Sequence, residues 1–166
     1  MPKPSPMQNL HRAEFEERDA PQGFRARRAR IGHELGSERL GASLWELPPG
    51  EAAYPYHFHH NDEELVVVLA GAPSLRGPDG WRELEDGEVV WFPRGERGGH
   101  QLVNRTDEPV RFLAVSTKGD ADVVVYPDSG KLGAFERLPA GGGLNRLFRL
   151  ADAVDYWDGE ERPPTG

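Results

Sequence analysis

Glycine and proline divide this chain into short segments, and that division limits the folds it can adopt. Twenty glycines and fifteen prolines are spread along the 166 residues. Between them lie runs rich in Val, Leu, Phe and Trp, which favour strands, and turn sequences such as GPDG, EDG and PDSG separate the runs. Many short strands at this spacing predict an all-β barrel or sandwich of antiparallel sheets with little helix. The predicted strands lie within residues 41–50, 64–71, 72–77, 81–87, 88–95, 100–104, 110–117 and 122–127.

The length suits one domain, and no internal linker divides it. We expect a single domain over residues 1–166 with its core at about 40–127. An N-terminal strand extension is expected at 23–39 and a C-terminal extension at 128–159, where residues 144–159 could form either a short helix or a strand. The segments 1–22 and 160–166 are expected to be loosely held tails.

Composition excludes several classes of function. The net charge is −8 without a basic stripe, so a nucleic-acid partner is not expected. No apolar run reaches the roughly 18 residues that a membrane span needs, and the first twenty residues lack the apolar core of a secretory signal. We therefore expect a soluble, cytoplasmic protein without a membrane partner. The chain has no cysteine, so any metal site must use histidine and carboxylate ligands.

Three of the six histidines stand together in the sequence PYHFHHNDEELVVVLAG, residues 55–71. His57 and His59 are two residues apart, so on a strand they face the same side with Cβ atoms roughly 6–7 Å apart. Two imidazoles at that separation can reach one ion at about 2.0–2.1 Å. His60 has the opposite parity, and we expect it to be an exposed neighbour. The pattern predicts a metal site that begins with His57 and His59.

The carboxylate ligand is ambiguous from parity alone. A straight strand favours Glu63, but the preceding Asn and Asp tolerate a turn, which would reset the parity and leave Glu64 equally possible. Asp62 and whichever glutamate is not a ligand are expected to be solvated. Among the remaining histidines, His100 is the best third ligand, because it opens a predicted strand directly after a glycine-rich turn.

The glycines around the histidine pair are regularly spaced. Gly50 precedes His57 by a spacer of six residues, four residues separate His59 from Glu64, and six more separate Glu64 from Gly71. These glycines, like Gly87 and Gly95 further on, are expected to occupy turns that need positive φ or a close approach of the backbone.

A second spaced pattern surrounds the third histidine. Gly87 is followed after five residues by Pro93-Arg94-Gly95, then after four residues by His100, and after three more by Asn104. Together the two patterns resemble the two motifs of the cupin superfamily, with one extra spacer residue in the first and two in the second. The wider chain resembles a group of small bacterial single-domain cupins of unassigned activity. In this pattern Asn104 is expected to fix the backbone rather than to contact substrate.

The resemblance implies a cupin double-stranded β-helix, with the interval 72–86 as a short hairpin, and it assigns the carboxylate ligand to Glu64. It implies that His57, His59, Glu64 and His100 bind one divalent transition metal ion (Zn, Mn, Fe, Ni or Co) with one or two open positions for a small-molecule ligand or substrate. Dioxygenase and isomerase chemistry both occur on this motif. The alternative is a cupin that binds a small ligand through its metal without catalysis.

Two further expectations concern the catalytic group and the assembly. No general base is evident, and His60 and Tyr54 are the residues considered for that role. The segment 23–48, with Trp45 and Leu47, resembles the N-terminal sheet extensions that form interfaces in cupins, so a homodimer is expected.

Overall fold

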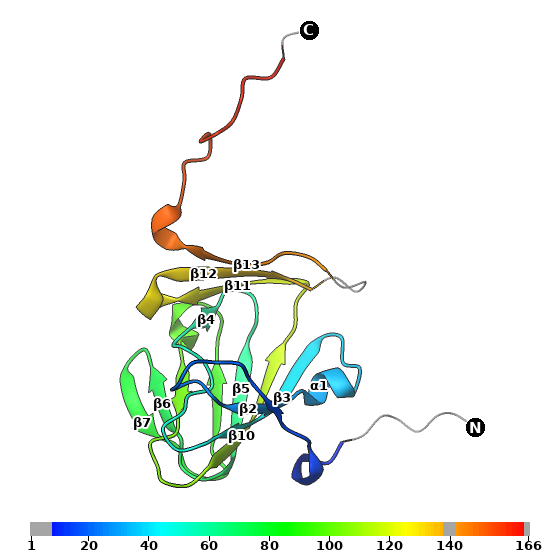
Figure 1. Ribbon diagram of the computed structural model, residues 1–166, viewed down its shortest axis with the longest axis vertical. Coiled ribbons are helices and arrows are strands. Elements are labelled where there is room, and N and C mark those ends of the chain that lie inside the picture. Colours follow the sequence, from blue (N-terminus) through cyan, green and yellow to red (C-terminus); the bar gives the residue numbers. More distant parts are fainter. Residues whose placement is uncertain (1–7, 138–141, 165–166) are drawn as a thin grey trace, which may run out of the picture.

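Antiparallel sheets make up most of the computed structural model, which describes residues 8–137 and 142–164 (Figure 1). The expected all-β class is confirmed, since helical structure in these residues is limited to short segments. These are α1 (Ile31–Glu34) and the 3-10 turns η1 (Leu10–Arg12), η2 (Glu96–Gly98), η3 (Pro127–Ser129) and η4 (Leu150–Asp152). No helix in the described part of the chain is long and apolar enough to cross a membrane.

The strands form three sheets. The six-stranded sheet contains, in spatial order, β1 (Glu16–Glu17), β2 (Arg27–Ala29), β3 (Leu40–Leu47), β10 (Val110–Thr117), β5 (Glu64–Ala70) and β8 (Val89–Phe92). The four-stranded sheet contains β13 (Asn145–Arg149), β12 (Lys131–Glu136), β11 (Ala121–Tyr126) and β4 (Phe58–His59). The three-stranded sheet contains β7 (Gly80–Glu83), β6 (Ser74–Gly77) and β9 (Gln101–Val103). The pair β6 and β7 is the hairpin expected in the interval 72–86.

The barrel core follows from strand alternation. In β5, Val66 and Val68 are buried on the inner face, whereas Leu65, Val67 and Leu69 face outward and are partly or fully exposed. The inward residues of the neighbouring strands complete one apolar cluster, which is the main stabilising feature of the fold. Its fully buried members include Trp45, Leu47, Val68, Leu84 and Val110.

Trp45 and Leu47 therefore belong to the core. Their side chains are buried within the chain, so they are not available to the expected N-terminal interface. Strand β2, itself part of the segment 23–48, lies beside β3 in the sheet and pairs Arg28 with Trp45. Part of the expected N-terminal tail is also held in place. Phe15 packs against a small cluster around Ile31 and Leu44.

The C-terminal extension adds two strands and then leaves the body. Strands β12 and β13 lengthen the sheet that starts with β4 and β11, so residues 144–159, which the sequence left open, begin as a strand. After η4 the chain runs away from the sheets (red in Figure 1), with Tyr156 and Trp157 exposed.

Candidate metal centre and its pocket

Short strand segments bring the histidines together. His59 ends β4 and pairs with Val124 of β11, which fixes the direction of its side chain. His57 and His100 form an isolated bridge in which each backbone N–H donates to the carbonyl of the other, at 3.2 and 2.9 Å. The extra residues before His100 are accommodated by η2, so they do not displace it from the cluster.

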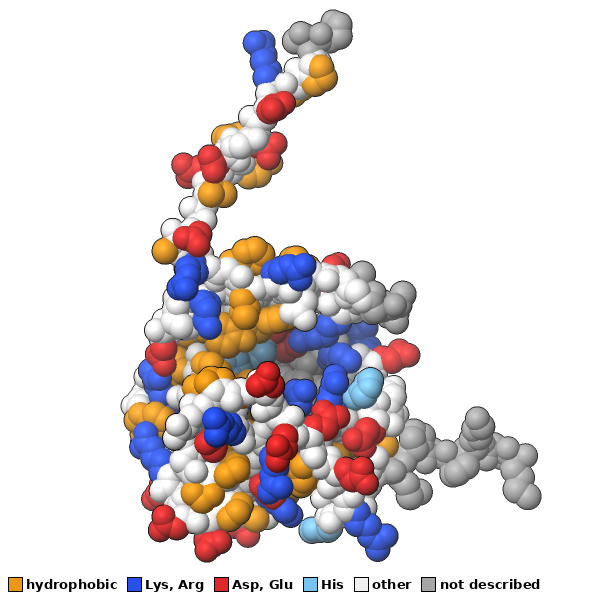
Figure 2. Space-filling view, viewed as in Figure 1, with side chains coloured by type: hydrophobic (Ala, Val, Ile, Leu, Met, Phe, Trp, Pro, Cys, Tyr) orange, Lys and Arg blue, Asp and Glu red, His pale blue; other side chains and the backbone are white. Residues whose placement is uncertain are grey.

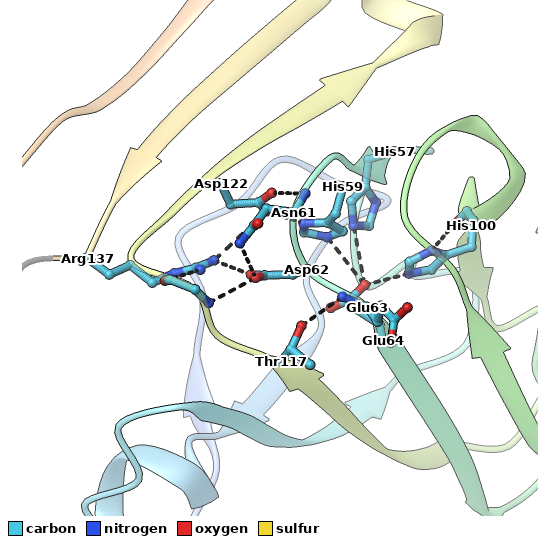
Figure 3. Close-up of polar contacts among 12 residues, drawn as sticks. His57, His59, Asn61, Asp62, Glu63, Glu64, His100, Thr117, Asp122 and Arg137 are labelled. Carbon is cyan, nitrogen blue, oxygen red and sulfur yellow. Dashed lines mark hydrogen bonds and ion pairs between the residues drawn. The ribbon is translucent and has the colours of Figure 1, made fainter.

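Glu64 opens β5 and supplies the carboxylate of the cluster (Figure 3). Its Oε2 lies 3.1 Å from Nε2 of His100, 3.3 Å from Nε2 of His59 and 4.0 Å from Nε2 of His57. Two ligand atoms that each lie about 2.1 Å from one ion are roughly 3.0–3.4 Å apart. The spacing of these atoms therefore suits a single divalent ion.

Each imidazole is oriented by an acceptor on its far side. Nδ1 of His57 lies 2.9 Å from the carbonyl oxygen of Pro55, and Nδ1 of His100 lies 2.9 Å from that of Gly98. Nδ1 of His59 lies 2.6 Å from Oδ2 of Asp122. Since these acceptors carry no proton, each Nδ1 must donate, and the metal-binding lone pair is left on Nε2. All three Nε2 atoms face the Glu64 carboxylate.

One of these nitrogens has no hydrogen-bond partner. Nε2 of His59 is buried and unpaired among the described residues, although buried polar atoms almost always find a partner. A metal ion would satisfy this atom. The residues present therefore fit the ion that the sequence pattern predicts.

Burial and neighbouring charges shift the pKa values of the residues in the cluster in different directions. Burial lowers the pKa of His57 to about 3, with the neighbouring His100 acting in the same direction. Burial also opposes the charged form of His59, but its hydrogen bond to Asp122 and the nearby Glu64 carboxylate outweigh burial and raise its pKa to about 10. Burial opposes the ionised form of Glu64, yet the nearby imidazoles of His100 and His59 hold its pKa well below the usual value. The space between Glu64 and Asp122 therefore stabilises positive charge.

A layer of charged residues behind His59 was missed or misread from the sequence. Asp122 is buried, and its other oxygen accepts from the backbone N–H of Asn61 at 3.0 Å. Asp62, expected to be solvated, is also buried and forms an ion pair with Arg137 at 2.7 Å. A sequence signal for Asp122 did exist, because it is in phase with the buried Val124 on the same strand.

The remaining histidines, the neighbouring Glu63 and Asn104 lie outside the cluster. His60 and Glu63 are both exposed, and the backbone N–H of Glu63 donates to Oγ1 of Thr117 at 2.9 Å. His11 lies in η1 and His33 in α1. Asn104 is fully buried, and its amide group donates to the carbonyls of Leu47 and Glu108, as its expected backbone-fixing role requires.

The four glycines of the motifs all have positive φ, as expected. The angles are +79° at Gly50, +82° at Gly71, +83° at Gly87 and +80° at Gly95. At Gly71 a Cβ would also meet Cγ1 of Val110 at 2.7 Å, so both backbone and packing require glycine there.

A cavity of about 500 Å³ opens onto the cluster. His57, His59 and Glu64 line one part of it, and Tyr54 and Tyr126 lie beside them. Figure 2 shows the hollow between the sheets, with histidine visible at its depth and basic side chains along one side. The remaining lining residues are Arg28, Arg30, Val124, Phe135, Glu136, Arg137 and Asn145.

Comparison with known proteins identifies the architecture. Residues 43–116 match the family model described as Cupin domain, and no curated protein matches the chain in sequence. A sugar phosphate isomerase of Silicibacter pomeroyi, described as a member of a cupin superfamily, is similar in structure. The TM-score is 0.76, with 27% identity over 92% of this chain and 98% of that chain. A proposed sugar phosphate isomerase of Acidithiobacillus ferrooxidans has a TM-score of 0.75 and 26% identity over 87% and 88% of the two chains. The polyketide cyclase RemF of Streptomyces resistomycificus has a TM-score of 0.58 and 26% identity over 68% and 78%.

Proposed function

Because this chain carries a cupin domain with the double-stranded β-helix fold, we propose that it is a metal-dependent enzyme that isomerises a small hydroxy-carbonyl compound. The proposed ligands of one divalent transition metal ion are His57, His59, Glu64 and His100. The observation that carries the proposal is the convergence of three Nε2 atoms on the Glu64 carboxylate, at the base of a cavity large enough for a small molecule.

A divalent ion bound with an open position would polarise a carbonyl or hydroxyl oxygen of the substrate. The chain's own residues would supply hydrogen bonds and proton transfer. Burial raises the pKa of Tyr54 and of Tyr126, so both phenols remain protonated at neutral pH and can donate to substrate oxygens. Tyr54 is one of the two residues considered for catalysis from the sequence, whereas the exposed His60 is not among the residues lining the cavity.

Isomerisation also needs a group that moves a proton between adjacent carbons. Outside the proposed ligand set, Glu136 is the carboxylate among the residues that line the cavity in the described part of the chain. We assign it as the base that takes a proton from the carbon beside the carbonyl and returns it to the former carbonyl carbon. The electron pair of the broken C–H bond forms a carbon–carbon double bond while the carbonyl π pair moves to its oxygen. That oxygen takes up the proton that the neighbouring hydroxyl gives up as the new carbonyl forms, so the isomerisation requires no oxidant.

The names of two structural neighbours favour isomerisation over the dioxygenase chemistry that the cupin motif also permits. The test is to load the protein separately with Mn, Fe, Co, Ni and Zn and to incubate it with neutral and phosphorylated aldoses and ketoses in D₂O. We expect metal-dependent incorporation of deuterium beside the carbonyl, and its loss in Glu136→Gln. Dioxygen consumption would instead support a dioxygenase. Saturable binding without exchange would support a non-catalytic binding protein.

A further inference from the structure

The cavity holds a second buried polar atom without a partner. Of the buried side-chain nitrogen and oxygen atoms in the described residues, two lack a hydrogen-bond partner, and these are Nε of Arg28 and Nε2 of His59. Both residues line the same cavity. A buried donor without a partner is unfavourable and uncommon in folded proteins, so such an atom calls for an explanation. A metal ion accounts for the acceptor on His59, but the donor on Arg28 needs an acceptor of its own.

Strand geometry places a second arginine beside the first. Arg28 lies within β2 and Arg30 follows that strand, so both have the same parity, and both line the cavity. Between them Ala29 is fully buried on the opposite side. The guanidinium carbon of Arg28 also lies 5.4 Å from the ring centroid of Trp45, and this contact helps to hold its position.

Several other arginines have carboxylate partners. Arg27 and Arg111 pair with Glu46, and Arg137 pairs with Asp62. Within residues 8–137 and 142–164, no ion pair joins Arg28 or Arg30 to a carboxylate. Glu136 shares the cavity, but one of its oxygens accepts the backbone N–H of Leu144 at 3.0 Å. The wall formed by β2 is therefore positively charged and faces the cavity.

We propose, resting on the function proposed above, that Arg28 and Arg30 form an anion subsite that binds the phosphate group of a phosphorylated substrate. Two guanidinium groups offer more donors than one carboxylate can accept, whereas a phosphate monoester presents three oxygens and up to two negative charges. One end of the substrate lies at the His57–His59–Glu64–His100 cluster, and its phosphate lies against β2. Both arginines lie outside residues 43–116, so the subsite is an addition to the matched cupin domain.

The subsite is tested by calorimetric titration of the metal-free, full-length protein with inorganic phosphate and with the pair ribose 5-phosphate and ribose. We expect both phosphates to bind and ribose not to bind. Arg28→Gln and Arg30→Gln should each weaken phosphate binding at least tenfold, since each removes a charged hydrogen-bond donor. Arg28→Lys should retain part of the affinity because it keeps the charge. The control is Arg25→Gln, an exposed neighbour that is not among the cavity-lining residues and should bind phosphate as the wild type does.

Several outcomes would overturn the subsite. These are absence of phosphate binding, equal affinity in the Arg28→Gln and wild-type proteins with matching near-ultraviolet circular dichroism, or acetate binding as tightly as phosphate. Because the titration uses metal-free protein, the subsite can succeed even if the metal proposal fails. Conversely, if Arg28→Gln binds metal normally but has lost phosphate binding, the two sites are separate.

Discussion

At the residue scale, the account depends on how each histidine is held. Parity correctly placed His57 and His59 on one side, but it could not choose between Glu63 and Glu64, because the turn at residues 60–62 resets the alternation. Asp122 escaped prediction for a different reason. Its phase with Val124 indicates burial, but its contact with His59 joins residues 63 positions apart, and strand parity does not identify such a partner.

Asp122 supports His59 from behind, and removing its charge should weaken metal binding. Asp122→Asn keeps the shape but loses the ionised acceptor that lies 2.6 Å from Nδ1 of His59. Loss of such an outer partner typically reduces metal affinity by about 10–100-fold, and we expect a decrease in that range in competition titrations with a chelator. Asp128→Asn is the matched control, since Asp128 is exposed and pairs with Arg76 away from the cluster. Equal affinities for the two variants would contradict this role.

His59 should also give the metal-free protein a characteristic pH dependence. Its pKa is raised from 6.5 to about 10 by Asp122 and Glu64 against the effect of burial. A raised folded-state pKa stabilises the fold fully below the unfolded value, and the stabilisation is lost as the pH rises through the folded value. The stability advantage of the wild type over His59→Gln should therefore shrink between pH 6.5 and about 10. Denaturant unfolding in the presence of a chelator measures it, and an advantage that grows with pH would disprove the assignment.

At the scale of the elements, most core strands could be predicted because Gly and Pro mark their ends. Strand β12 was missed because its sequence, KLGAFE, contains a central glycine and reads as a continuation of the preceding turn. The sequence did not decide between helix and strand for β13. Its residues are all exposed, so no alternation of apolar and polar positions marked a strand. Strand β12 forms by pairing with β11, and β13 forms by pairing with β12, so both depend on tertiary contacts.

The turn η2 is the element that positions His100, and its glycines are required by space. A Cβ at Gly98 would overlap the carbonyl oxygen of Pro93. Gly98→Ala should therefore destabilise the protein by about 1–3 kcal/mol and lower its metal content, since η2 directly precedes His100. Gly77→Ala is the control, because the nearest atom to its new Cβ lies 4.0 Å away. Thermal unfolding and elemental analysis check both, and equal behaviour of the two variants would contradict the packing argument.

At the scale of the whole molecule, the part of the large sheet formed by β5 and β8 leaves apolar side chains exposed on one face. Strand β5 carries Leu65, Val67 and Leu69 on its outer face, and the neighbouring β8 adds Val89 and Trp91, which are 55% and 59% exposed. Strands that are apolar on both faces are usually buried on both. We propose that a second copy of this chain covers this face, which places the expected homodimer interface on β5 and β8 rather than on Trp45 and Leu47.

A change on that face should separate the copies without unfolding the barrel. Trp91→Glu should convert the dimer to a monomer in light scattering at micromolar concentration, because a charge would be buried without a partner. Trp81→Gln is the control, since Trp81 is exposed on β7 in another sheet and should leave the dimer intact. A monomeric wild-type protein at this concentration would reject the interface.

The central claim is that His57, His59, Glu64 and His100 hold one metal ion, and the contrast between adjacent glutamates tests it most directly. Metal content should be measured by mass spectrometry in Glu64→Gln and Glu63→Gln, purified side by side and dialysed against the same metal. Glu64→Gln removes the carboxylate that faces all three Nε2 atoms, and its metal content should fall sharply. Glu63→Gln changes an exposed side chain and should keep about one ion per chain, as should His60→Ala. Loss of metal in Glu63→Gln together with full metal in Glu64→Gln would contradict the account.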